Sequence, residues 1–145
     1  MGFTTDSLEH GWCSELDCSY QLDALDRFLG GNAEKLQRAI RAATGDAQAL
    51  LRAKFPDAWP FATPPPELRE WVAAIAVYKA VRSIGAAGGQ EMLMMDLRKG
   101  AEAAERFLRA VAMGQAEFTL LRPQNQVFIN QPSVAQGGGG EFGFG

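Results

Sequence analysis

The stretch that decides the fold lies at residues 66–84, which read PELREWVAAIAVYKAVRSI. Pro66 suits the first position of a helix, because proline lacks the N–H group that this position leaves unbonded. Apolar residues cover one face of the expected helix and much of the rest: Trp71, Ala74, Ile75, Tyr78 and Val81, then Val72, Ala73, Ala76 and Val77. A helix that is apolar almost all round is normally buried. The sequence therefore predicts that this segment forms the central helix of the domain or of its assembly.

Two long amphipathic helices are expected on either side of this segment. The first should start after Asn32, a good N-cap, and end at Phe55, because the following proline pushes Phe55 out of the helical region. The second is predicted over residues 90–113, with Gly114 as its C-terminal cap. Gly45, inside the first of these helices, is interpreted as a mark of close packing.

Shorter helices are expected before Asn32. Capping residues at 5–7 predict a short helix from Thr5 that Gly11 ends, and one or two helical turns should follow over residues 23–29. The predicted fold is therefore all-α, a small bundle of four to five helices. Residues 1–114 are assigned to this helical domain, and residues 115–145 to an extended, glycine-rich C-terminal arm.

Length and composition restrict the class of protein. The chain has 145 residues, of which 47% are hydrophobic, and this fits one globular domain. No apolar run reaches the ~20 residues that are needed to cross a bilayer. Residues 1–6 lack the basic start of a signal peptide. We therefore expect a soluble protein that is made in a cytoplasm and does not interact with a membrane.

Charge is distributed unevenly along the chain. Residues 1–32 hold six acidic residues and one basic residue, whereas residues 33–60 hold five basic and three acidic residues. This pattern is typical of a solvated acidic loop, and it would also suit head-to-tail contacts between subunits. For the second interpretation, the candidate basic interface residues are Lys35, Arg38, Arg41 and Arg52.

The C-terminal arm has its own composition. Six of the 16 glycines lie in the last nine residues, and Arg122 is the one basic residue after Gly114. Residues 117–121 and 126–130 favour short β-strands, which are too small to form a sheet alone. We predict that this arm adds strands to, or lies along, a neighbouring subunit or another protein. Its candidate anchors are Phe118, Phe128, Ile129, Phe142 and Phe144.

No catalytic or metal site is predicted. His10, Cys13, Asp17 and Cys18 lie close together in sequence, but structural zinc normally takes a second pair of ligands, and this chain offers none. Two reduced thiols are the simpler interpretation, and a disulfide between them would require the segment to curl. The glycines of residues 85–89 lack the lysine of a phosphate-binding loop. We therefore expect neither a cofactor nor an enzymatic activity.

Three stretches together resemble a known family: AEKLQRAIRAA with LLRAKFP (residues 33–43 and 50–56), PELREWVAAIAVY (66–78) and EAAERFLRAVAMGQ (102–115). They resemble the Mu-like prophage gp36 group, a domain found beside tailed-phage capsid genes. This group is similar to the head–tail connector proteins, also called adaptor or head-completion proteins, which form a ring under the portal. Phe55 and Ala101 stand at positions where tyrosine is common in that group.

The resemblance implies a structural virion protein at the head–tail junction, assembled in the host cytoplasm. It also implies a homo-oligomeric, dodecameric ring that contacts the portal protein and tail or neck proteins, with non-specific contact to packaged DNA. The alternative is a small cytoplasmic helical regulator or DNA-binding module. Against that alternative, no expected helix concentrates lysine and arginine as a recognition helix would.

Overall fold

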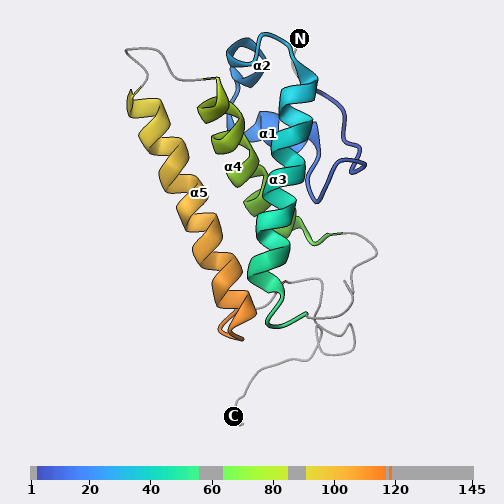
Figure 1. The fold of residues 1–145 in the computed structure, drawn as a ribbon, viewed down its shortest axis with the longest axis vertical. Helices are drawn as coiled ribbons and strands as arrows, with labels where there is room; N and C mark the ends of the chain where they lie inside the picture. Colours follow the sequence, from blue (N-terminus) through green and yellow to red (C-terminus); the bar gives the residue numbers. More distant parts are fainter. Residues whose placement is uncertain (1–2, 56–63, 85–90, 117, 119–145) are drawn as a thin grey trace, which may run out of the picture.

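The computed structural model describes residues 3–55, 64–84, 91–116 and 118, and these residues form a helical bundle without strands (Figure 1). The predicted all-α class is confirmed for this part of the chain. The proposed β-strand segments of the arm lie outside the described residues, apart from Phe118. The helices are α1 (Glu15–Gln21), α2 (Leu25–Phe28), α3 (Ala33–Leu51), α4 (Pro66–Ser83) and α5 (Glu91–Ala112).

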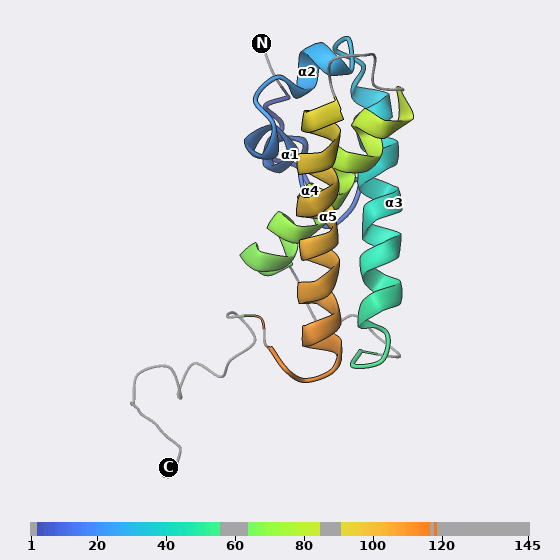
Figure 2. The same cartoon turned by 90° about the vertical axis from the view of Figure 1, so that its left-hand side faces the viewer.

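Helix α4 is the centre of the bundle, as its sequence predicts. The long helices α3 and α5 both pack along it, and the short helices α1 and α2 contact it as well (Figures 1 and 2). Its buried residues are mostly small or β-branched, which allows close approach on several sides: Leu68, Val72, Ala73, Ile75, Ala76, Val77, Ala80 and Val81.

The ends of the long helices follow their local signals. Asn32 Oδ1 accepts hydrogen bonds from the N–H groups of Glu34 and Lys35, so the predicted N-cap of α3 is confirmed. Gly114 has φ +79°, and the Gln115 N–H bonds to the Ala110 carbonyl at 2.8 Å. This left-handed C-cap confirms the predicted end of α5. Helix α3 ends at Leu51, earlier than predicted.

The predicted helix beginning at Thr5 is wrong, and the first helix begins at Glu15 instead. Ser14 and Asp17 form a capping box: Ser14 Oγ accepts from the Asp17 N–H at 3.0 Å, and Asp17 Oδ2 accepts from the Ser14 N–H at 2.9 Å. Thr5 instead accepts a hydrogen bond at its carbonyl from the Leu16 N–H. The segment before α1 is therefore a loop that is bound to that helix.

Gly11 brings this N-terminal loop into direct contact with α3. The neighbouring Trp12 N–H donates to Thr44 Oγ1 at 2.9 Å. A β-carbon added at Gly11 would overlap Thr44 Oγ1 and lie 2.8 Å from Ile40 Cγ2. At Gly45, by contrast, an added β-carbon would meet nothing within 4 Å. The close-packed glycine is therefore Gly11, and the interpretation of Gly45 as a close-packing position is wrong.

Arg69 joins the N-terminal loop and α1 to α4. Its Nε donates to Asp17 Oδ2 at 2.8 Å, and its terminal nitrogen forms an ion pair with Asp6. Ser14 Oγ also donates to Asp6 Oδ1, at 2.8 Å. The hydrogen bonds from Ser14 and Arg69 hold the pKa of Asp6 below its usual value. The hydrogen bond to Asp17 raises the pKa of the Arg69 guanidinium.

The packing at Gly11 is tested by two alanine substitutions. We expect Gly11→Ala to lower the free energy of unfolding by about 1–3 kcal/mol, the usual effect of overpacking a tight site. Gly45→Ala is the matched control, and it should raise stability by about 0.5–1 kcal/mol because the site is open and helical. Urea denaturation measures both values. Equal effects of the two substitutions would contradict the contact between the loop and α3.

The Arg69 network predicts a pH dependence of stability. A carboxyl group whose folded pKa is depressed stabilises the fold above its unfolded pKa, and this contribution is lost as the pH falls through the folded value. We expect Arg69→Met to destabilise the protein at pH 7, and the difference from the wild type should shrink below about pH 4. Arg38→Met is the control, because the Arg38 side chain is exposed. Urea titrations across this pH range measure the effect, and a pH-independent difference would refute it.

Candidate interaction surfaces

The four predicted basic residues do not form a single surface. Lys35 and Arg38 lie in the first turns of α3, and both are exposed. Arg41 instead points to the N-terminal loop, where its terminal nitrogen lies 3.0 Å from His10 Nδ1. Arg52 follows the C-terminal end of α3, about 25 Å from Lys35 at the helical rise per residue. The four residues of the predicted interface therefore have three different surroundings.

Lys35 and Arg38 line a hollow between α3 and α4. The hollow has a volume of about 370 Å³, and its other lining residues are Ala39, Lys79, Ala80 and Ser83. Lys79 Nζ forms an ion pair with Asp46 Oδ2 at 2.9 Å. The hollow is therefore lined by three cationic side chains from α3 and α4 and by two alanines.

A second hollow, of about 270 Å³, lies between α4 and α5 and shares Lys79 with the first. On its α4 side, the Arg82 guanidinium lies 5.1 Å from the centre of the Tyr78 ring. On its α5 side, Arg98 Nε bonds to Glu102 Oε2 at 3.2 Å. We call the two hollows together the basic groove, after its cations Lys35, Arg38, Lys79, Arg82 and Arg98.

The acidic residues of the N-terminal segment divide into two groups. Asp6 and Asp17 are bound by Arg69, and Glu15 Oε2 accepts from Gln37 Nε2 at 3.1 Å. Asp23 and Asp26 flank the start of α2, and Asp23 is exposed. Within the described residues, no side-chain hydrogen bond or ion pair holds either of these two carboxylates. We call Asp23 and Asp26 the acidic turn.

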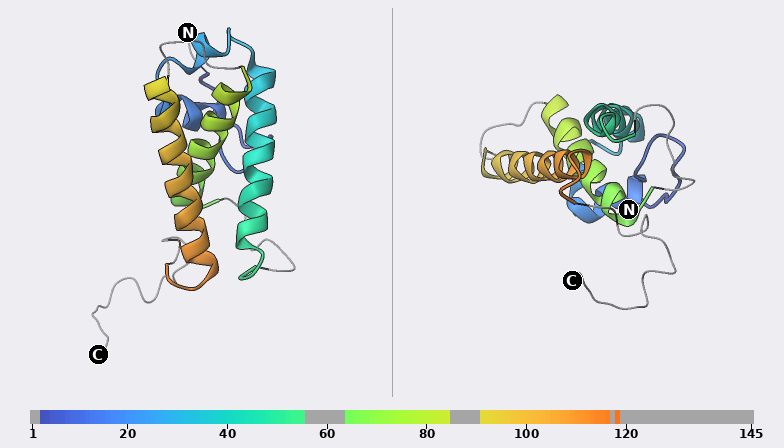
Figure 3. Two further views of the ribbon diagram at one scale, coloured as in Figure 1. Left: turned by 60° about the vertical axis from the view of Figure 1, so that its left-hand side comes forward. Right: turned by 90° about the horizontal axis from the view of Figure 1, so that it is seen from below.

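The basic groove and the acidic turn are formed by different helices of the bundle. In the view from below in Figure 3, α3 and the C-terminal half of α4 lie toward one side, and the blue helices α1 and α2 lie toward the other. The groove lies between α3, α4 and α5, whereas the acidic turn joins α1 to α2. Each subunit therefore carries its basic and its acidic residues on different helices.

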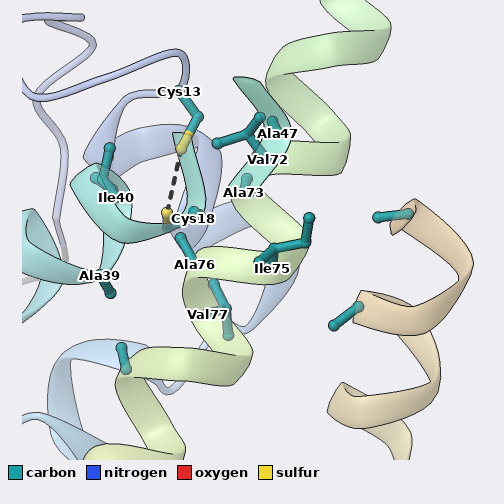
Figure 4. Close-up of a cluster of buried hydrophobic side chains, with 14 of the residues drawn as sticks. Cys13, Cys18, Ala39, Ile40, Ala47, Val72, Ala73, Ile75, Ala76 and Val77 are labelled. Carbon is teal, nitrogen blue, oxygen red and sulfur yellow. Dashed lines mark hydrogen bonds between the residues drawn. The ribbon is translucent and has the colours of Figure 1, made fainter. Parts of the chain in front are cut away.

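The two cysteines are part of the core rather than of an accessible site. Cys13 and Cys18 are both fully buried, and their Sγ atoms lie 3.9 Å apart beside α3 and α4 (Figure 4). They flank the capping box of α1 at the positions where two apolar residues usually contact each other. The Cys13 thiol and burial together raise the pKa of the Cys18 thiol. His10 points instead to Arg41 and Glu9.

Among the described residues, no group of three or more His, Cys, Asp and Glu side chains is placed to hold a metal ion. In the same part of the chain, no helix is both long enough and apolar enough to span a bilayer.

Phe118 does not project from the subunit as the sequence predicts. It is fully buried, and its ring lies 5.7 Å from that of Trp71, which stacks on Phe107 at 5.3 Å. After Gly114 the chain therefore returns to the first turns of α4, and Phe118 belongs to the helical body. The other predicted anchors of the arm lie outside the described residues: Phe128, Ile129, Phe142 and Phe144.

Several residues of these surfaces were not predicted, although the sequence holds signals for them. Lys79 interrupts the apolar run of residues 71–81, and this indicates a part of α4 that is not fully buried. The spacing of Ser14 and Asp17 is that of a capping box, which would have located α1. Arg82 and Arg98 carry no such signal, because only the packing of α4 against α5 brings them together.

Comparison with known proteins supports the resemblance noted above. Residues 17–132 match the family described as Bacteriophage Mu, Gp36. No curated protein and no solved structure matches the chain. The matched range includes α2 to α5 and most of α1, and it covers well over half of the sequence. The protein is therefore a phage protein and belongs to the bacteriophage Mu Gp36 family.

Proposed function

We propose that this protein is a structural subunit of the phage particle that joins the head to the tail. In this proposal it forms a homo-oligomeric ring at the head–tail junction, between the portal protein and the tail or neck proteins. The observation that carries the proposal is the match to the Mu Gp36 family over residues 17–132. The similarity of that group to head–tail connectors supplies the position in the particle.

The charge distribution of the subunit supports self-assembly. A closed ring is built from heterologous contacts, in which one surface of a subunit meets a different surface of the next. This chain carries a basic groove between α3, α4 and α5 and an acidic turn between α1 and α2, so it offers two different surfaces of opposite charge.

The aromatic packing at the lower end of α5 supports a role for the arm outside the subunit. Phe118 is buried against Trp71, so this residue of the arm is held beside the first turns of α4. The arm sequence contains Phe128, Ile129, Phe142 and Phe144 among small and polar residues. We propose that these side chains bind a neighbouring subunit, the portal or a tail protein.

The proposed function predicts the phenotype of a phage that lacks this chain. Deletion of its coding sequence should leave filled heads and free tails that are not joined, because the ring that connects them is missing. Electron microscopy of the lysate measures the fraction of joined particles, and the intact chain supplied in trans should restore it. Normally joined particles in the deletion strain would contradict the proposed role.

The burial of Phe118 predicts where the arm can be removed. A chain ending at residue 118 should unfold at the same urea concentration as the full chain and should fail to restore joined particles. A chain ending at residue 114 should be less stable by about 3–5 kcal/mol, because it also loses a buried phenylalanine. If the chain ending at 118 joined heads to tails, the arm would have no role in docking. Equal stability of the two truncated chains would contradict the Trp71–Phe118 contact.

A further inference from the structure

We propose that the basic groove of one subunit binds the acidic turn of a second copy of this chain. This inference rests on the proposed ring and specifies its subunit contact. It differs from the interface expected from sequence, because Arg41 and Arg52 are not part of it. Its basic side is formed by three helices instead of by one face of α3.

The groove has a small excess of positive charge, which is opposite in sign to the charge of the acidic turn. Three of its five cations already have carboxylate partners: Arg38 pairs with Glu34, Lys79 with Asp46, and Arg98 with Glu102. Among the described residues, Lys35 and Arg82 have no carboxylate partner. Because Glu105 also lines the groove, its five cations stand against four carboxylates (those of Glu34, Asp46, Glu102 and Glu105), and a net positive charge is left for the acidic turn.

The same arrangement favours a protein segment over nucleic acid as the occupant. Duplex DNA presents one negative charge per ~1.7 Å and selects rows of cations that are free to neutralise phosphates. In this groove, most cations are already neutralised, and Glu102 and Glu105 line its α5 side. A duplex needs a row of free cations, which this groove lacks, whereas a short turn with two acidic residues needs only Lys35 and Arg82.

The groove also has apolar surface for a side chain that accompanies the acidic turn. Ile75, Tyr78 and Ala101 line the α4–α5 hollow beside the charged residues. On the acidic side, the Tyr20 ring is 75% exposed and lies three residues before Asp23. An exposed aromatic ring next to two carboxylates is suited to a hollow that combines apolar and cationic walls. Tyr20 is therefore expected to enter the groove together with the turn.

The positions of the two surfaces determine how the contacts continue from one subunit to the next. The groove and the turn are separate surfaces formed by different helices, so two different neighbours can occupy them in one subunit. Each copy would use its groove for one neighbour and its turn for the other. This is the head-to-tail association that a closed ring requires.

The proposal is tested by a charge swap. One variant reverses the groove (Lys35→Glu with Arg82→Glu), a second reverses the turn (Asp23→Lys with Asp26→Lys), and a third carries all four substitutions. The control reverses two exposed cations on the outer side of α5 (Lys99→Glu with Arg106→Glu). Light scattering during size-exclusion chromatography measures the mass of each full-length protein against the 15.7 kDa of one chain. Circular-dichroism melting establishes that each variant is folded.

We expect the wild type and the control to assemble and each reversed variant to be monomeric, with its dissociation constant raised at least about tenfold. The chain with all four substitutions should regain assembly, because the two surfaces are complementary again. As a second measurement, high salt should weaken wild-type assembly, because the contact is between exposed charges.

Two results would overturn the groove contact while leaving the ring in place. One is assembly of both reversed variants at wild-type strength. The other is binding of duplex DNA by the wild type that the groove variant loses without any change in its assembly. A wild-type chain that remains at 15.7 kDa at every concentration would instead contradict the proposed ring, and the groove contact with it.

Discussion

The burial of α4 is the constraint on which the rest of the structure depends. Its apolar residues point in almost every direction, so the helix needs neighbours on several sides to leave water. Helices α3 and α5 cover much of it, and α1 with the N-terminal loop covers another part. The N-terminal segment is therefore a component of the fold, and Gly11, Arg69 and the two buried cysteines are the residues that attach it.

Three cations lie on this apolar helix, Arg69, Lys79 and Arg82, and the first two differ in their surroundings. Arg69 binds Asp6 and Asp17 of the same subunit, and so it neutralises two acidic residues of the N-terminal segment. Lys79 lies where the hollows on either side of α4 meet, at the side that the other helices leave open. Arg69 therefore forms contacts within its own subunit. Lys79 lines the groove to which, in our proposal, the next subunit binds.

The parts of the fold that depend on local signals could be predicted from the sequence. Pro66, Asn32 and Gly114 sit at helix ends whose backbone geometry they favour on their own, and the predicted helices begin or end beside them. The short helix expected from Thr5 is wrong because a second set of capping residues, Ser14 and Asp17, is completed by Arg69 from α4. The surfaces also depend on tertiary contacts. Phe118 is buried against Trp71, and the groove is lined by residues that are far apart in sequence. Neither contact has a periodic pattern that sequence alone reveals.

The central claim is that one subunit meets the next through two different surfaces, and zero-length crosslinking measures this most directly. Assembled protein made from equal amounts of ¹⁴N- and ¹⁵N-labelled chains would be treated with a carbodiimide, which joins lysine amines to carboxylates. Mass spectrometry of the digest identifies links between differently labelled chains. The proposed contact predicts mixed-label links from Lys35 or Lys79 to Asp23 or Asp26. Mixed-label links confined to other residue pairs, with none between the groove and the acidic turn, would contradict it.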